Sequence, residues 1–199
     1  MINIEKQKEH FKNHIATVKD YGNIKILDFK NPNSNEYRIR FLFEEDYYRL
    51  HITGDLGDLI ACNPYNMTFD KFNTFANNVG YFREKIDCVS RRLYYYDDNK
   101  AREDLLKLVE ELEIESWEFE DVGYSDSNEW IDNILENFYD DRGISDKGYE
   151  IFEKIVIDAF EYVSDIGKKE TGILDLYMLA FKLAMEQLFE NRKCDKNDV

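Results

Sequence analysis

Two neighbouring stretches in which apolar and polar side chains alternate constrain the fold of this chain more than any other feature. A period of two predicts strands that bury one face only. The apolar side consists of Tyr37, Ile39, Phe41 and Phe43 in the first stretch and Tyr48, Leu50 and Ile52 in the second. Residues 24–29 predict a strand before them, and residues 59–62 a short one after them. We therefore expect an antiparallel sheet of three to four strands.

Helical spacing of apolar residues predicts helices on both sides of this sheet. Residues 4–20 show that spacing before the sheet, and residues 68–86 predict two short helices after it. Farther along, helices are predicted at 97–112, from 127 through Phe138 to an end at Gly143, at 152–163 and at 173–189, whereas 115–121 fits either a helix or a strand. The expected fold class is α+β, with an α+β domain at 1–96 and an acidic helical domain at 97–199 packed against it.

The last predicted helix, Ile173 to Phe189, is apolar on nearly every side. Such a helix must be buried, either centrally or between two copies in a homodimer. Its most apolar members are Leu176, Phe181, Leu183 and Leu188. Charged residues interrupt the run, which is also too short to span a bilayer, so we expect no membrane association.

The sequence shows none of the common catalytic motifs. The sequence contains no phosphate-binding glycine loop and no nucleophile elbow. His10 and His14 are four residues apart but lack a third ligand, and we interpret them as exposed polar side chains. Cys62, Cys88 and Cys194 show no CxxC spacing, and no cleavable leader is evident, which predicts a reducing cytoplasm. We expect a protein that is not an enzyme and uses no cofactor.

Asp55 and Asp58 alternate with glycines in the segment Thr53-Gly54-Asp55-Leu56-Gly57-Asp58. Several carboxylates in one short turn are what a hard cation needs, so a metal-dependent hydrolase is an alternative hypothesis. The spacing does not match an EF-hand, and Gly-Asp pairs are common in plain turns. We favour the turn and expect no metal.

Charge is distributed very unevenly along the chain. Residues 97–150 hold 19 acidic and 5 basic side chains, whereas residues 1–92 hold 13 and 14, and the whole chain has a net charge of -16. This balance disfavours direct binding of duplex DNA through its phosphates. Carboxylates three or four residues apart on a helix lie about 5 to 6 Å from each other, so a face of them can imitate a nucleic-acid backbone.

We expect the acidic region to bind a basic nucleic-acid-binding protein or nuclease complex. The contact residues that we predict, opposite the apolar helix stripes, are Glu103, Glu110, Glu111, Asp132, Glu136, Asp140 and Asp141. Solvated acidic faces without a partner are the alternative. Arg38, Arg40 and Arg49 form a second candidate patch on the polar side of the sheet, for RNA or an acidic partner. Cross-strand pairing of these arginines with Glu36, Glu44 or Glu45 is the competing interpretation.

Three short motifs occur in order within residues 37–96: Ile52 to Asp58, then Asn78-Val79-Gly80-Tyr81-Phe82, then Lys85 to Cys88. In these motifs the chain resembles small accessory proteins carried by phages and prophages of low-GC Gram-positive bacteria. The resemblance brings no assigned functional residues. It implies an inhibitor of host defence, such as an anti-CRISPR protein, in the cytoplasm of the bacterial host. A cytosolic immunity protein that neutralises a nuclease toxin fits the same acidity and size.

Overall fold

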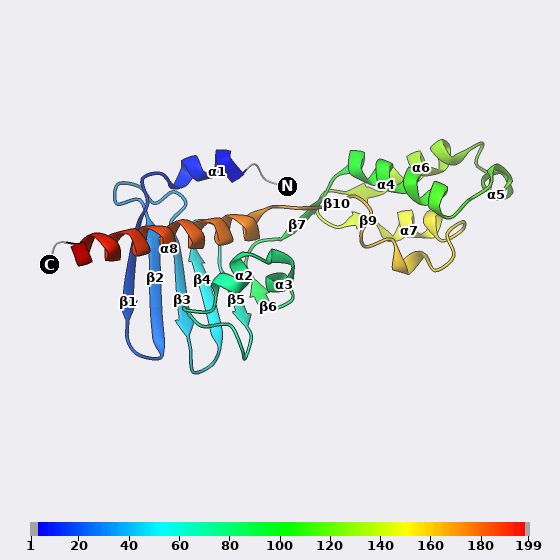
Figure 1. Ribbon diagram of the computed structural model, residues 1–199. Helices are drawn as coiled ribbons and strands as arrows, with labels where there is room; N and C mark the ends of the chain where they lie inside the picture. The colour runs from blue at the N-terminus through cyan, green and yellow to red at the C-terminus, as the bar shows by residue number, and fades with distance from the viewer. Residues whose placement is uncertain (1–3, 198–199) are drawn as a thin grey trace. The chain divides into compact units, whose positions relative to one another are not determined.

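Six strands form one antiparallel sheet in the computed structural model, which describes the backbone of residues 4–197 and the side chains of residues 5–190. The strands follow one another across the sheet in sequence order (Figure 1). They are β1 (Ile15–Asp20), β2 (Ile24–Lys30), β3 (Ile39–Glu44), β4 (Arg49–Gly54), β5 (Leu59–Cys62) and β6 (Ile86–Val89). The α+β class is confirmed. The expected sheet of three to four strands is too small, because β1 and β6 were not predicted.

The predicted helix at 4–20 is wrong beyond its first part. Helix α1 spans Ile4–Phe11, and β1 begins at Ile15. Ala16 is buried while Ile15 is 53% exposed, so the period in β1 is two. The three-residue spacing from Ile15 to Val18 imitated a helical stripe in a strand only six residues long.

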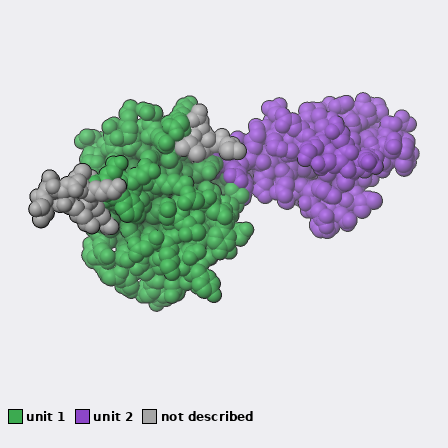
Figure 2. Space-filling model, viewed as in Figure 1, with its two compact units in different colours: residues 1–93, 172–199 green, residues 94–171 purple. Residues whose placement is uncertain are grey.

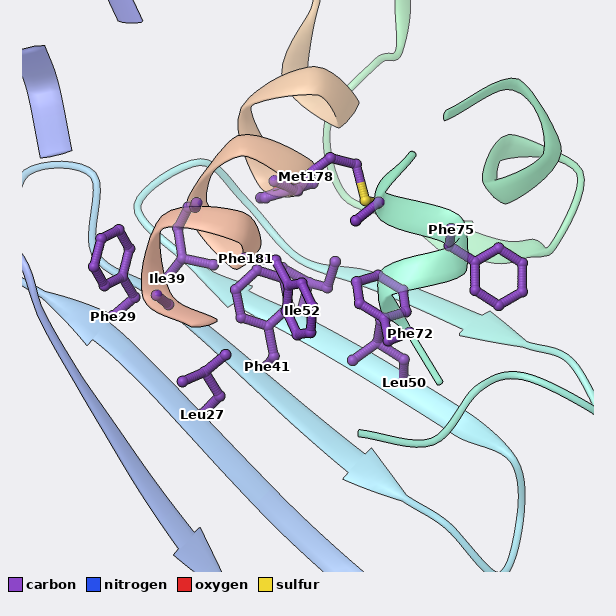
Figure 3. Close-up of a cluster of buried hydrophobic side chains, with 14 of the residues drawn as sticks. Leu27, Phe29, Ile39, Phe41, Leu50, Ile52, Phe72, Phe75, Met178 and Phe181 are labelled. Atoms are coloured by element: carbon purple, nitrogen blue, oxygen red, sulfur yellow. The ribbon is translucent and has the colours of Figure 1, made fainter. Parts of the chain in front are cut away.

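Helix α8 (Ile173–Asn197) lies across one face of the sheet (Figure 1). Its Phe181 is fully buried, with ring centroids 5.4 Å from Phe41 and 4.8 Å from Phe72 (Figure 3). Phe72 adjoins α2 (Asn73–Ala76), which packs on the same side with α3 (Val79–Arg83). Phe181 is therefore central. The other predicted members, Leu176, Leu183 and Leu188, are partly buried against the same core.

The chain divides into two compact units (Figure 2). Residues 1–93 and 172–199 form the first unit, and residues 94–171 form the second. The first division lies between Leu93 and Tyr94, and the predicted boundary follows residue 96. The structure does not place residues 97–199 in one domain, because α8 packs on the sheet of the first unit.

The second unit has its own buried core around Trp130. The Trp130 ring lies 5.8 Å from that of Phe152, and its Nε1 donates to the Ile151 carbonyl oxygen at 3.2 Å. Its helices are α4 (Asp98–Glu111), α5 (Ser116–Asp121), α6 (Ser127–Leu135), α7 (Asp146–Phe152) and the 3₁₀ turn η1 (Ala159–Glu161). Strand β7 (Tyr94–Tyr96) pairs with β10 (Lys168–Glu170), and β8 (Phe138–Tyr139) pairs with β9 (Gly143–Ile144). This unit is therefore mixed rather than purely helical.

Two predicted helix bounds in this unit are wrong. Helix α6 ends at Leu135, and Phe138 belongs to β8. Helix α7 ends at Phe152, and residues 153–163 form turns and η1, where Asp158 adopts a left-handed backbone with φ 56° that no regular helix contains. Val156 and Ala159 are nevertheless buried, which explains the helix-like spacing. Among the described residues, no helix has the length and apolarity to cross a bilayer.

Candidate interaction surfaces

The segment Gly54 to Asp58 is hydrogen-bonded to the residues that lead into β3. Asp55 accepts a hydrogen bond from the Tyr37 backbone N–H at 3.0 Å, and its own N–H donates to the Arg38 carbonyl oxygen at 2.9 Å. Gly54 has φ +151°, and a Cβ there would lie 1.9 Å from that same oxygen. Only glycine fits so close to the neighbouring strand. The Asp55 carboxylate thus fixes a turn, which is the interpretation that the sequence favoured.

The second half of the segment forms hydrogen bonds with α8 and with Ser90, which directly follows β6. The Tyr177 hydroxyl lies 3.1 Å from the Leu56 carbonyl oxygen and 3.2 Å from that of Gly57, and burial raises the pKa of Tyr177 to about 12. Asp58 N–H donates to Ser90 Oγ at 2.7 Å. Within the part of the chain that the structure describes, no three His, Cys, Asp or Glu side chains gather as a metal site would require.

The motif at Asn78 to Phe82 is also part of the framework. Asn78 caps α3 by accepting from the Tyr81 N–H at 3.0 Å, and Phe82 is fully buried. The Tyr81 ring stacks on Phe75 with centroids 5.4 Å apart. The first two of the three motifs that carry the resemblance therefore stabilise the first unit.

His10 and His14 were both predicted to be exposed, which is right for His10 and wrong for His14. His10 stacks on the Tyr37 ring at 4.4 Å, but His14 is buried with 4% exposure. His14 Nε2 lies 3.1 Å from the Tyr37 carbonyl oxygen. Burial lowers the pKa of His14, an effect that its backbone hydrogen bonds oppose.

The arginine patch is divided by the sheet register. Arg40 pairs with Asp28 through two hydrogen bonds of 2.6 and 2.9 Å, not with the glutamates considered above. Arg38 lines the same pocket as Arg40. Arg49 lies at the other end of β4, four residues from the Thr53 that faces Arg40, which is about 13 Å along the strand. Arg38 and Arg40 are therefore together, and Arg49 is separate.

Several carboxylates of the second unit serve its helix ends. Asp97 caps α4 and accepts from Lys169 Nζ at 3.0 Å, and these hydrogen bonds lower its pKa. Asp126 caps α6, and Glu129 accepts from the Ser125 N–H at 2.7 Å, which lowers the pKa of Glu129. Glu115 and Glu118 form a capping box at α5. These acids stabilise helix N-termini and need no partner to explain them.

The seven predicted contact residues are all exposed. Glu111 pairs with Lys107 at 3.0 Å, and Asp132 pairs with Arg102. For Glu110, Glu136 and Asp140, the described side chains provide no ion pair. Three of the seven are not on helices, and one of these, Glu136, is the C-cap of α6. Asp140 and Asp141 lie in the turn between β8 and β9, because α6 ends earlier than predicted.

The net charge follows the structural division. The second unit holds 24 acidic and 8 basic side chains, whereas the first unit holds 18 of each. The entire net charge of -16 therefore belongs to residues 94–171. The uneven distribution of charge is visible in the sequence, but only the fold shows that the acidic region is one compact unit.

Large apolar side chains are exposed on the same unit. Trp117 is 58% exposed, Phe160 66% and Ile157 84%. Trp117 lies on α5 between acidic neighbours, where sequence analysis left the structure open. Exposed tryptophan and phenylalanine side chains are typical anchors of protein interfaces.

Comparison with known proteins adds no functional information to these surfaces. No family model, no curated protein and no solved structure matches the chain.

Proposed function

We propose that this protein is a non-enzymatic inhibitor of a host nucleic-acid-targeting defence complex, of the anti-CRISPR kind. Its second unit imitates nucleic acid and occupies a basic groove of the target. The observation that carries the proposal is the confinement of the whole net charge of -16 to residues 94–171. Duplex DNA has one charge per about 1.7 Å of axis, so this charge equals that of about 27 Å of duplex.

The placement of carboxylates at helix C-termini supports a partner. Glu110 and Glu111 lie in the last turn of α4, and Glu136 is the C-cap of α6. The C-terminus of a helix carries partial negative charge, so each acid there costs about 0.3 to 1 kcal/mol. Neither helix has a basic residue in its last turn. Positive charges of a bound partner would offset this cost.

Charge and apolar anchors have separate roles in this proposal. The acidic surface accelerates encounter with a basic groove, an effect that salt screens. Trp117 adds contact area that slows dissociation once the complex has formed. A merely solvated acidic face would not need an exposed tryptophan.

The test is competition for nucleic acid. A single-effector CRISPR ribonucleoprotein is incubated with labelled target DNA, and its binding is followed by fluorescence anisotropy as this protein is added. We expect the protein to displace the DNA, with an apparent affinity that falls steeply as salt rises. No displacement at low salt would contradict the proposal for this target class. Displacement from a basic nuclease toxin alone would favour the immunity-protein alternative.

Matched charge reversals locate the surface. Glu110→Lys, Glu136→Lys and Asp140→Lys together should slow association at least tenfold. The control reverses three exposed carboxylates of the first unit, Glu36, Asp70 and Asp87, and so makes the same change in net charge. Trp117→Ala should instead accelerate dissociation. Equal effects of the two triple variants would show that net charge alone acts, without a defined surface.

A further inference from the structure

A polar pocket of about 230 Å³ opens on the face of the sheet opposite α8. Its lining residues point away from the core because they alternate with buried neighbours such as Phe29, Ile39 and Phe41. They are Asp28, Lys30, Arg38, Arg40, Thr53 and Gly54. An adjoining pocket of about 310 Å³ shares Lys30 and Arg38 and is otherwise lined by residues 31–35.

The first pocket carries two unneutralised positive charges. Arg40 is neutralised by its two hydrogen bonds to Asp28, whereas neither Lys30 nor Arg38 has a side-chain hydrogen bond or ion pair within the described residues. Phe29 and Ile39 are the last paired residues of β2 and β3, so Lys30 and Arg38 follow directly opposite each other. Like charges in cross-strand positions are destabilising. A bound anion would offset that repulsion.

The backbone that presents Arg38 is fixed at both sides. Its N–H donates to the Asn35 carbonyl oxygen at 3.3 Å, and its carbonyl oxygen accepts from Asp55 at 2.9 Å. Gly54 packs directly against that oxygen. Thr53 is exposed beside Arg40 and supplies a hydroxyl donor. Donors held in place before binding lose less entropy when a ligand arrives.

The loop of the second pocket is rich in amides. Asn31 and Ser34 use their side-chain oxygens to accept from the Asn33 and Glu36 N–H groups, at 2.9 and 3.1 Å. The side-chain amides of Asn33 and Asn35 make no hydrogen bond within the described part of the chain, so both donors and acceptors remain for a ligand.

We propose that these adjoining pockets bind a small phosphomonoester, with its phosphate between Lys30 and Arg38 and its polar body against residues 31–35. A phosphomonoester carries about -1.5 to -2 charges at pH 7, which matches the two free cations. Arginine and lysine are the usual donors to phosphate oxygens. A nucleic-acid strand is disfavoured, because the two pockets offer two cations without an ion pair among the described residues, Lys30 and Arg38, whereas a strand carries a phosphate charge on every nucleotide.

The test is isothermal titration calorimetry of the full chain with inorganic phosphate, adenosine 5′-monophosphate and adenosine. We expect both phosphate compounds to bind, the nucleotide more tightly, and adenosine not to bind. Lys30→Ala with Arg38→Ala should weaken phosphate binding at least tenfold. Lys19→Ala with Lys154→Ala removes the same charge outside the pockets and should change affinity less than twofold.

Three outcomes would overturn the proposal: no binding of either phosphate compound at millimolar concentration, equal weakening in both double variants, or tight binding of adenosine. A short single-stranded RNA that binds more tightly than the nucleotide, and loses affinity in the Lys30 and Arg38 variant, would replace the small ligand with nucleic acid. Circular dichroism melts of each variant control for folding. Because these residues belong to the first unit, the outcome is independent of the competition test above.

Discussion

Replacement of Gly54 by alanine should be among the most damaging single-methyl additions in this protein. The new Cβ would lie 1.9 Å from the Arg38 carbonyl oxygen, a backbone atom that can move only if β3 and β4 separate. The positive φ of +151° adds about 1 to 3 kcal/mol of backbone strain. Overpacking adds about 1 to 3 kcal/mol, and loss of the Asp55 to Arg38 hydrogen bond about 1 kcal/mol. We expect Gly54→Ala to lower the free energy of unfolding by about 4 kcal/mol or more.

Gly22→Ala is the matched control. Gly22 also has a positive φ, of +82°, but nothing lies within 4 Å of an added Cβ. It should cost only about 1 to 2 kcal/mol, the strain of a left-handed alanine. Urea unfolding followed by circular dichroism measures both variants, and tryptophan fluorescence reports the second unit separately, because Trp117 and Trp130 both lie in it. If Gly54→Ala costs no more than Gly22→Ala, the close approach does not limit stability and the argument fails.

Three further experiments test the fold and its charges. Glu110→Lys with Glu136→Lys should raise the free energy of unfolding by about 0.3 to 1 kcal/mol each, since lysine suits a helix C-terminus, and the tryptophan urea midpoint would show it. Burial lowers the pKa of His14, so its contribution to stability is complete above pH 6.5 and is lost as pH falls through the lowered value. His14→Gln should therefore reduce the loss of stability between pH 7 and 5, and an unchanged slope would contradict this. Phe181→Ala should cost about 3 to 5 kcal/mol by leaving a cavity. Phe189→Ala, at a side chain 56% exposed, should cost far less in the same urea titration.

The spacing of apolar residues predicted those strands and helices that bury one face only and are long enough for the spacing to repeat. Strands β3 and β4 were found because every second residue faces the core. Strand β6, Ile86–Val89, has four residues and a register shift opposite Ile60 and Ala61, so its pairing depends on a neighbour distant in sequence. No local period encodes such a contact.

The candidate surface was predicted only in part for the same reason. Helical spacing correctly placed Glu103 and Glu110 in solvent, opposite the buried Leu105 and Leu108. Spacing cannot separate carboxylates that cap helices, such as Asp126, from those left without a basic partner. Arg38 was predicted as part of the arginine patch, but its place opposite Lys30 was not, because that pairing depends on the register of β2 and β3.

The return of the chain to the first unit at Gly172 has a consequence for biosynthesis. Ribosomes release residues in order, so the aromatic face of the sheet, with Phe41 and Phe72, emerges long before the helix that covers it. At about 5 to 20 residues per second, the interval between Leu93 and Gly172 lasts roughly 4 to 16 s. Throughout that time the nascent sheet displays bare apolar surface, while residues 94–171 already contain everything that their own core needs. The inserted unit is thus the first part able to fold, and a message truncated before α8 would yield an aggregation-prone product.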